Sequence, residues 1–132
     1  MSGSGPQVSQ VSSVTAAADT AEHVLAAVTG SWNNPGGNYL SVSAAFTGAA
    51  AGTVTLRVRQ GSLTGTQVGP NMPFVASSGS ANLPGLEILD TSSFATTLQA
   101  NQSYVLTYQQ SAVSLGTFTN AALGLETASP VQ

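Results

Sequence analysis

The stretch Thr53-Val54-Thr55-Leu56-Arg57-Val58-Arg59-Gln60 decides the fold class, because apolar and polar residues alternate along it without a break. Val54, Leu56 and Val58 share one face of an extended chain, and a period of two is that of a half-buried β-strand. The sequence therefore predicts a strand over 53–60 that turns its aliphatic residues to a core and both arginines to the outer face.

Alternation of the same kind recurs at Tyr39–Thr47 and at Ser103–Gln110. Shorter apolar stretches between Gly, Asn and Pro residues predict further strands at 63–68, 71–77, 86–89, 94–98 and 113–127, the last with a bulge or hairpin near 118–120. About eight strands at this spacing indicate an all-β fold, and one-sided alternation indicates antiparallel pairing. The expected architecture is a two-sheet β-sandwich, specifically a jelly-roll-like one.

Residues 16–30 fit two patterns. A helix would begin at Asp19 and Glu22, which resemble a capping box. A strand over 22–29 would instead place alternate residues on one face, namely Val24, Ala26 and Val28. The strand is favoured because everything downstream reads as β structure.

The expected organisation is a flexible N-terminal arm over residues 1–15 followed by one sandwich domain over 16–132. Within that arm, residues 7–15 read as an extended arm or an edge strand. The chain has no cysteine, which excludes disulfides and thiolate metal sites. Its start lacks the basic and apolar regions of a secretory signal, so we expect synthesis in the host cytoplasm without export by that route.

Charge is scarce: Lys and Arg total 2 and Asp and Glu total 5 in 132 residues, for a net charge of −3. An ordinary soluble domain of this length carries roughly thirty charged residues. Two cations are too few to bind nucleic acid or an anionic membrane surface, and no apolar run is long enough for a transmembrane helix. Such a surface suits a protein that packs against neighbouring copies.

Candidate catalytic groups are few. His23 is the sole histidine, and a hydrogen-bonded or surface role is favoured over a base or a metal ligand. The carboxylates Glu87 and Asp90 fall on opposite faces of their strand, and no Gly-x-Ser-x-Gly elbow or phosphate-binding loop is present. We therefore expect no catalytic residues, no metal site, no cofactor and no enzymatic activity.

Two groups of residues are candidate binding sites. Arg57 and Arg59 share one strand face, and pairing with an acid across the sheet and contact with a partner protein are equally favoured. The second group is an aromatic and amide set that fits sugar stacking and hydroxyl recognition: Trp32, Asn33, Asn34 and Tyr39. For these residues, capping the end of the sandwich core is favoured over glycan binding.

The run Val54-Thr55-Leu56-Arg57-Val58-Arg59-Gln60-Gly61 with Thr64-Gly65-Thr66-Gln67-Val68-Gly69 resembles a pattern of tailed-phage (bacteriophage) virion accessory proteins. The later Asn101-Gln102-Ser103-Tyr104-Val105-Leu106-Thr107-Tyr108 and Asn120-Ala121-Ala122-Leu123 are similar to the closing strands of that family. The resemblance covers residues 21–127. It implies a jelly-roll-like fold, homotrimers and a place on the capsid or tail exterior, and it supplies no catalytic residues.

The function expected from these observations is that of a non-enzymatic virion structural protein. It would be a capsid decoration (cement) or spike protein whose partners are other copies of itself, as a trimer, and the major capsid protein. The alternative is a carbohydrate-binding β-sandwich module that contacts surface glycans. An enzyme is the least favoured class.

Overall fold

The computed structural model describes residues 7–29, 38–78, 81–82, 87–90 and 103–127. They form ten β-strands: β1 (Gln7–Val11), β2 (Val14–Thr15), β3 (His23–Thr29), β4 (Asn38–Gly48), β5 (Gly52–Gln60), β6 (Gln67–Ala76), β7 (Ala81–Asn82), β8 (Glu87–Asp90), β9 (Ser103–Gln110) and β10 (Gly116–Thr127). A helix with the length and apolarity to span a membrane is not found in the described part of the chain.

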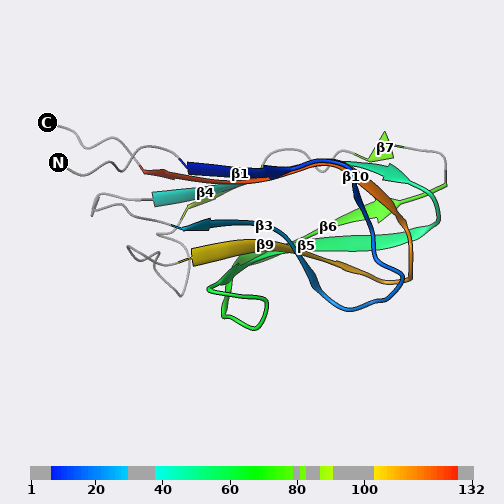
Figure 1. Ribbon diagram of the computed structural model, residues 1–132, viewed down its shortest axis with the longest axis horizontal. Coiled ribbons are helices and arrows are strands. Elements are labelled where there is room, and N and C mark those ends of the chain that lie inside the picture. Colours follow the sequence, from blue (N-terminus) through cyan, green and yellow to red (C-terminus); the bar gives the residue numbers. More distant parts are fainter. Residues whose placement is uncertain (1–6, 30–37, 79–80, 83–86, 91–102, 128–132) are drawn as a thin grey trace, which may run out of the picture.

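The strands form two sheets that face each other as layers (Figure 1). Sheet A has the order β1-β10-β4-β7, with β2 paired to β10 and β8 paired to β4, and sheet B has the order β3-β9-β5-β6. Every pair is antiparallel. The predicted all-β antiparallel sandwich is therefore confirmed.

The strand order is that of a jelly roll. When β1 with β2, and β7 with β8, are each counted as one strand, the described residues form eight strands. The pairs are then first with eighth, second with seventh, third with sixth and fourth with fifth. A long antiparallel hairpin rolled up on itself gives this order, and rolling it places consecutive strands in opposite sheets, except for β5 and β6, which pair with each other in sheet B.

The core lies between the sheets and is built by alternate residues, as predicted for β5, where Val54, Leu56 and Val58 are buried. Aromatic rings from both sheets meet in it. The Phe118 ring of β10 lies 4.8 Å from that of Phe46 and 5.2 Å from that of Tyr108, at inclined angles that suit aromatic pairs. These contacts join the sheets near the turn that follows β9.

The segment predicted as strand or helix is a strand, β3, but one of its predicted core residues faces solvent. Its register against β9 shifts between Val24 and Ala26, so Leu25 is an additional residue on the β3 side. Leu25, Ala26 and Val28 are buried, whereas 46% of Val24 is exposed. A bulge reverses the parity of the residues before it, and this is why Val24 lies on the outer face.

The stretches predicted as separate strands at 63–68 and 71–77 form one strand, β6. Leu63 lies in the turn before it, and Gly69 and Pro70 lie within it. The register to β5 shifts between Leu56 and Val58, so the Gly69–Asn71 stretch bulges. Prolines are tolerated here because β6 is at the edge of sheet B, and no described strand accepts hydrogen bonds on its outer side.

Three other expectations concern the chain termini and loops. Gln7–Val11 is an edge strand hydrogen-bonded to β10, so the arm belongs to sheet A from residue 7 onward, and residues 1–6 lie outside the described residues. The bulge expected near 118–120 is present between Phe118 and Asn120. The strand expected at 94–98 lies outside the described residues, whereas β7 is a short strand that was not predicted, between the stretches expected at 71–77 and 86–89.

Candidate functional site

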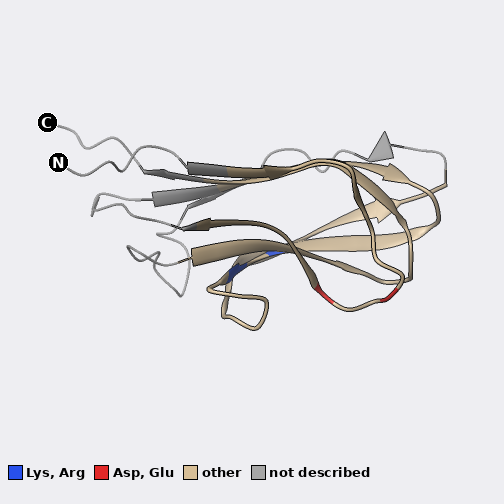
Figure 2. Cartoon of the chain, viewed as in Figure 1, with Lys and Arg blue, Asp and Glu red and all other residues tan. Residues whose placement is uncertain are grey.

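Charged side chains gather at one place on the described part of the molecule. Asp19 and Glu22 lie on the segment that crosses from sheet A to β3, and Arg57 and Arg59 lie on β5 (Figure 2). Sheet order places β9 between β3 and β5, and Glu22 meets both arginines across the outer face of β9, whereas Asp19 pairs with His23. We call the Glu22, Arg57, Arg59 and Thr107 side chains the outer-face cluster.

Glu22 is the centre of this cluster. Arg59 donates two hydrogen bonds to its carboxylate, from Nε to Oε2 over 2.7 Å and from Nη2 to Oε1 over 2.9 Å. The buried Thr107 hydroxyl of β9 donates to Oε2 from below, and Arg57 Nη1 lies 3.5 Å from Oε1. The three charged side chains are only 15–21% exposed, so the cluster is held in a partly dehydrated environment.

Further hydrogen bonds tie both arginines to the sheet. Arg57 donates from Nε to Asn71 Oδ1 over 3.0 Å and from Nη1 to Gln109 Oε1 over 2.8 Å. Arg59 Nη1 donates to the Gly65 carbonyl over 3.1 Å. The network therefore links β5, β6 and β9 to the segment before β3, and it fixes the direction in which each guanidinium points.

The ion pairs shift the acid–base properties of the cluster. Hydrogen bonds from Arg59, supported by Thr107 and by both positive charges, hold the pKa of Glu22 below its ordinary value, although partial burial opposes this. The same carboxylate raises the pKa of Arg59. Both groups are therefore charged at neutral pH, and neither is tuned to exchange a proton there.

A buried amide fastens the crossing segment itself. The Gln110 side chain is only 2% exposed, and its Nε2 donates to the carbonyls of Ala17 over 2.8 Å and Asp19 over 3.1 Å. Its Oε1 accepts from the Leu115 amide over 2.8 Å. In addition, the Ala17 amide donates to the Tyr108 hydroxyl over 2.9 Å. These bonds satisfy peptide groups that the crossing removes from the sheets.

Among the described residues, His23 contacts one acid and one aromatic ring. Its Nε2 lies 2.7 Å from Asp19 Oδ1 in an exposed pair, and its ring stacks on Tyr108 with centroids 5.4 Å apart. The hydrogen bond to His23 and that from the Ala21 amide lower the pKa of Asp19. No group of three or more metal-ligating side chains gathers anywhere in the described residues.

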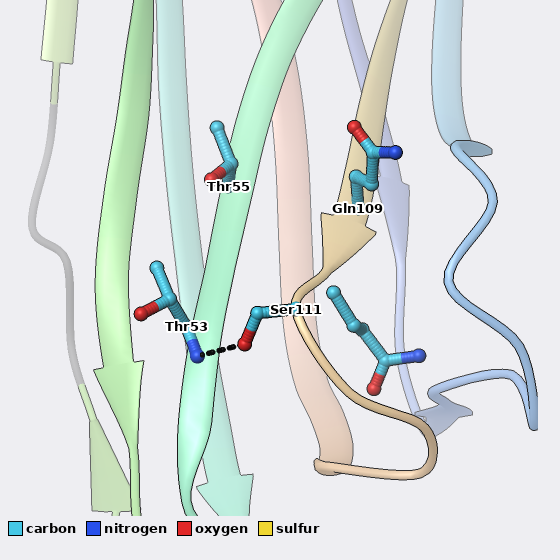
Figure 3. Close-up of a pocket in the computed structure, with 5 residues that line it drawn as sticks. Thr53, Thr55, Gln109 and Ser111 are labelled. Atoms are coloured by element: carbon cyan, nitrogen blue, oxygen red, sulfur yellow. Dashed lines mark hydrogen bonds between the residues drawn. The ribbon is translucent and has the colours of Figure 1, made fainter.

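An open hollow of about 270 Å³ lies beside the outer-face cluster, where β5 begins and β9 ends. Its lining is neutral: Thr53, Thr55, Gln109, Gln110 and Ser111. The Thr53 amide donates to Ser111 Oγ over 2.9 Å, and both glutamine side chains are held by the bonds described above (Figure 3). Hydroxyl and amide groups of this kind can bind a neutral polar group but supply no acid, base or strong nucleophile.

The predicted site residues have different outcomes. Pairing of Arg57 and Arg59 with an acid across the sheet is confirmed, and the acid is Glu22, two strands away from β5. Trp32, Asn33 and Asn34 lie outside the described residues, and Tyr39 is the second residue of β4. The roles of Glu22, Thr107 and Gln110 were not predicted. The sequence did contain one indication of the role of Glu22: the chain has only five acids, and its two cations lie on the same face of one strand.

Comparison with known proteins adds little. No protein-family model matches the chain, and no curated protein matches it. A solved structure of infectious bursal disease virus, Gx strain, aligns with 96% of this chain and 34% of that chain, with 14% identity and a TM-score of 0.33. This chain thus spans about a third of that one, and a score of this size assigns neither a family nor a function.

Proposed function

We propose that the chain is a non-enzymatic structural protein of a virus particle, a capsid decoration (cement) or spike protein of a tailed phage that acts as a homo-oligomer. The observation that carries the proposal is the scarcity of charge together with its placement. Of seven charged residues in the chain, four have described side chains, and all four are paired with groups of the same chain. They fasten the fold, and no described pocket gathers them for chemistry.

The remaining described surface favours repeated contact with neighbouring subunits. Residues that alternate with the core positions on β4 and β10 are small, and all but the alanine carry a hydroxyl: Ser41, Ser43, Ala45, Thr47 and Thr117. A neutral surface has little electrostatic repulsion between copies, and each hydroxyl is easily matched across an interface. Many weak contacts on one particle add through avidity, so single contacts do not need to be strong.

Sedimentation equilibrium of the full chain tests the self-association on which the proposal depends. The expected result is a concentration-dependent oligomer, of about three times 13.1 kDa for a trimer. Immunogold electron microscopy of particles purified from the source of the sequence tests the location, and regular labelling of the particle exterior is expected. A chain that stays monomeric at high concentration and labels no particle would disprove the proposal.

Carbohydrate binding is the second candidate, and the neutral hollow on sheet B is the observation that favours it. Hydroxyl and amide groups at fixed positions are typical of sites that recognise sugar hydroxyls. A glycan array followed by titration of Thr55→Val and Trp32→Ala variants separates the hollow from the Trp32 loop. Absence of binding to every glycan would eliminate this function without affecting the structural one.

A further inference from the structure

The first strand of the chain is held mainly through its backbone. β1 is the edge strand of sheet A and lies along β10, with Val11 opposite Ala121 (Figure 1). Of the β1 side chains that the structure describes, Ser9 and Val11 are half-buried, Gln10 is exposed, and none is fully buried. A hydrogen bond to sheet B is long, from the Ala27 amide to Ser9 Oγ over 3.4 Å. The described part of β1 therefore contributes little buried apolar surface, as is typical of elements that open locally.

The edge of β10 that β1 covers is, by contrast, buried. Ala121 and Leu123 are 0% exposed, and Ala122 is 9% exposed. If β1 left, the peptide groups of β10 that point to it would lose their partners and form an open sheet edge. The strand that fits this edge is β1, and the β1 of a second copy carries the same residues. The edge therefore requires a β1 strand, but not the one of its own chain.

The link between β1 and β2 is short, exposed and strained. Ser12 and Ser13 form it, and Ser13 has a φ of 55°, in the left-handed region that residues with a Cβ rarely adopt. The link lies between two separate pairings with β10, since β2 pairs with Thr117 and Phe118 and β1 begins at Ala121. The chain can therefore release β1 and keep β2 in place. We call Ser12 and Ser13 the hinge.

We propose that β1 is exchanged between copies of this chain, so that the β1 of one copy pairs with β10 of a neighbouring copy in the register found within one chain. An extended hinge returns Ser13 to ordinary backbone angles, and short hinges under strain favour exchange of the element that they carry. Two extended residues span at most about 7 Å, so the exchange brings the β1 edges of two copies together. Each copy gives one β1 and receives one, and every β10 edge stays covered in a closed oligomer. This inference rests on the proposed function, since it names the contact by which the homo-oligomer forms.

Engineered disulfides show which chain supplies β1, because the chain has no cysteine of its own. Ala122 of β10 has a register partner on each side, Gln10 on β1 and Ser43 on β4, so two matched cysteine pairs share one position. Residues opposite each other on antiparallel strands lie within the Cα separation of a disulfide. The full-length variants are oxidised at a concentration at which the native chain associates, and are then separated by electrophoresis in detergent without reductant.

The two pairs have different expected products. Gln10→Cys/Ala122→Cys should link chains covalently, up to the oligomer that sedimentation equilibrium finds for the native chain. The control Ser43→Cys/Ala122→Cys joins two strands that are not exchanged, and it should form its bond only within one 13.1 kDa chain. Gln10→Cys alone measures chance linkage between exposed thiols, and it should link far fewer chains than the pair.

The outcomes separate the exchange from the proposed function. If the native chain associates but the bond of Gln10→Cys/Ala122→Cys forms only within single chains, the exchange is wrong and the structural function stands. Linkage no greater than that of Gln10→Cys alone has the same meaning. If the native chain stays monomeric at high concentration, both fail.

The hinge gives a second test that needs no cysteine and decides the question if the paired variants do not fold. Ser13→Gly adopts a φ of 55° at little cost, so it should stabilise the unexchanged chain and weaken association about tenfold. Ser13→Pro cannot adopt that angle, because the proline ring fixes φ at about −65°, and it should strengthen association. Equal association of the two variants, or stronger association of Ser13→Gly, would overturn the exchange.

Discussion

Replacing Glu22 by glutamine removes the charge at the centre of the outer-face cluster with almost no change in size. The variant leaves Arg57 and Arg59 facing each other without a carboxylate, and it weakens the hydrogen bonds from Arg59 and Thr107. Exposed ion pairs contribute up to about 1 kcal/mol, and breaking a fully buried one costs about 3–5 kcal/mol. With side chains 15–21% exposed, this cluster lies between these limits, and we expect a loss of about 2 kcal/mol at neutral pH.

For a chain of this length, such a loss lowers the melting temperature by roughly 6–10 °C, which circular dichroism measures directly. The pH dependence gives a second readout. Because the folded state holds the pKa of Glu22 below its ordinary value of 4.5, its contribution is complete above pH 4.5 and is lost as pH falls through the lower, folded-state value. The stability difference between the native chain and Glu22→Gln should therefore shrink below pH 4.5.

The matched control for this experiment is Asp19→Asn, which also removes one carboxylate charge but from an exposed pair with His23. Its effect on the melting temperature at neutral pH should be small, because solvent screens that pair. If both variants lowered the melting temperature equally, the effect would come from the change in net charge and not from the partly dehydrated outer-face cluster. A Glu22→Gln variant as stable as the native chain at pH 7 would refute the reasoning outright.

Three further substitutions test other contacts by urea or thermal unfolding. Gln110→Leu should cost about 2–4 kcal/mol, because the Leu115 amide and two carbonyls of the crossing segment lose a buried partner; a cost under about 0.5 kcal/mol would show that water replaces the amide. Gly116→Ala should cost about 3 kcal/mol, since its Cβ would overlap the Thr47 carbonyl oxygen of β4, whereas Gly61→Ala, with a φ of 86° but open space, should cost about 1–2 kcal/mol; the reverse ranking would contradict the packing. Phe118→Ala should cost about 3–5 kcal/mol, because the ring is fully buried between the sheets, and a loss below about 1 kcal/mol would mean that the core collapses around it.

Strand positions were predictable because alternation is a local property of the sequence. The faces of β4, β5 and β9 followed from it, and the buried Val54, Leu56 and Val58 lie where the period of two places them. The failures occur where an additional residue enters a strand. In β3 the bulge at Leu25 moves Val24 to the outer face, and nothing in the local pattern distinguishes Leu25 from an ordinary core residue.

The outer-face cluster was only half predictable, because its geometry depends on sheet order. Alternation along residues 53–60 predicted that Arg57 and Arg59 share one face of a strand, where an acid could pair with them. The sequence contains five acids and does not show which of them is the partner. The choice of Glu22 follows from the position of β3 at the far side of β9, a pairing between segments about 80 residues apart in sequence. The sequence pattern predicts only that Thr107 lies on the polar face of β9. Its contact with Glu22 depends on the position of β9 between β3 and β5, which the pattern does not give.

The jelly roll explains why the two acids whose side chains are described, and several side-chain hydrogen bonds, lie at the first crossing between the sheets. Each change of sheet removes peptide groups from the ladders, and here the side chains of Gln109 and Gln110 replace the lost partners of Thr20, Ala17 and Asp19. These hydrogen bonds from glutamine side chains satisfy the backbone carbonyls, but water or another amide side chain could supply the same donors. The carboxylate of Glu22 is different, because its guanidinium partners are both on β5. They lie within reach of the segment before β3 because β9 alone separates β3 from β5 in sheet B. The cluster therefore favours this strand order over rival pairings, and it does so with three of the four charged side chains that the structure describes.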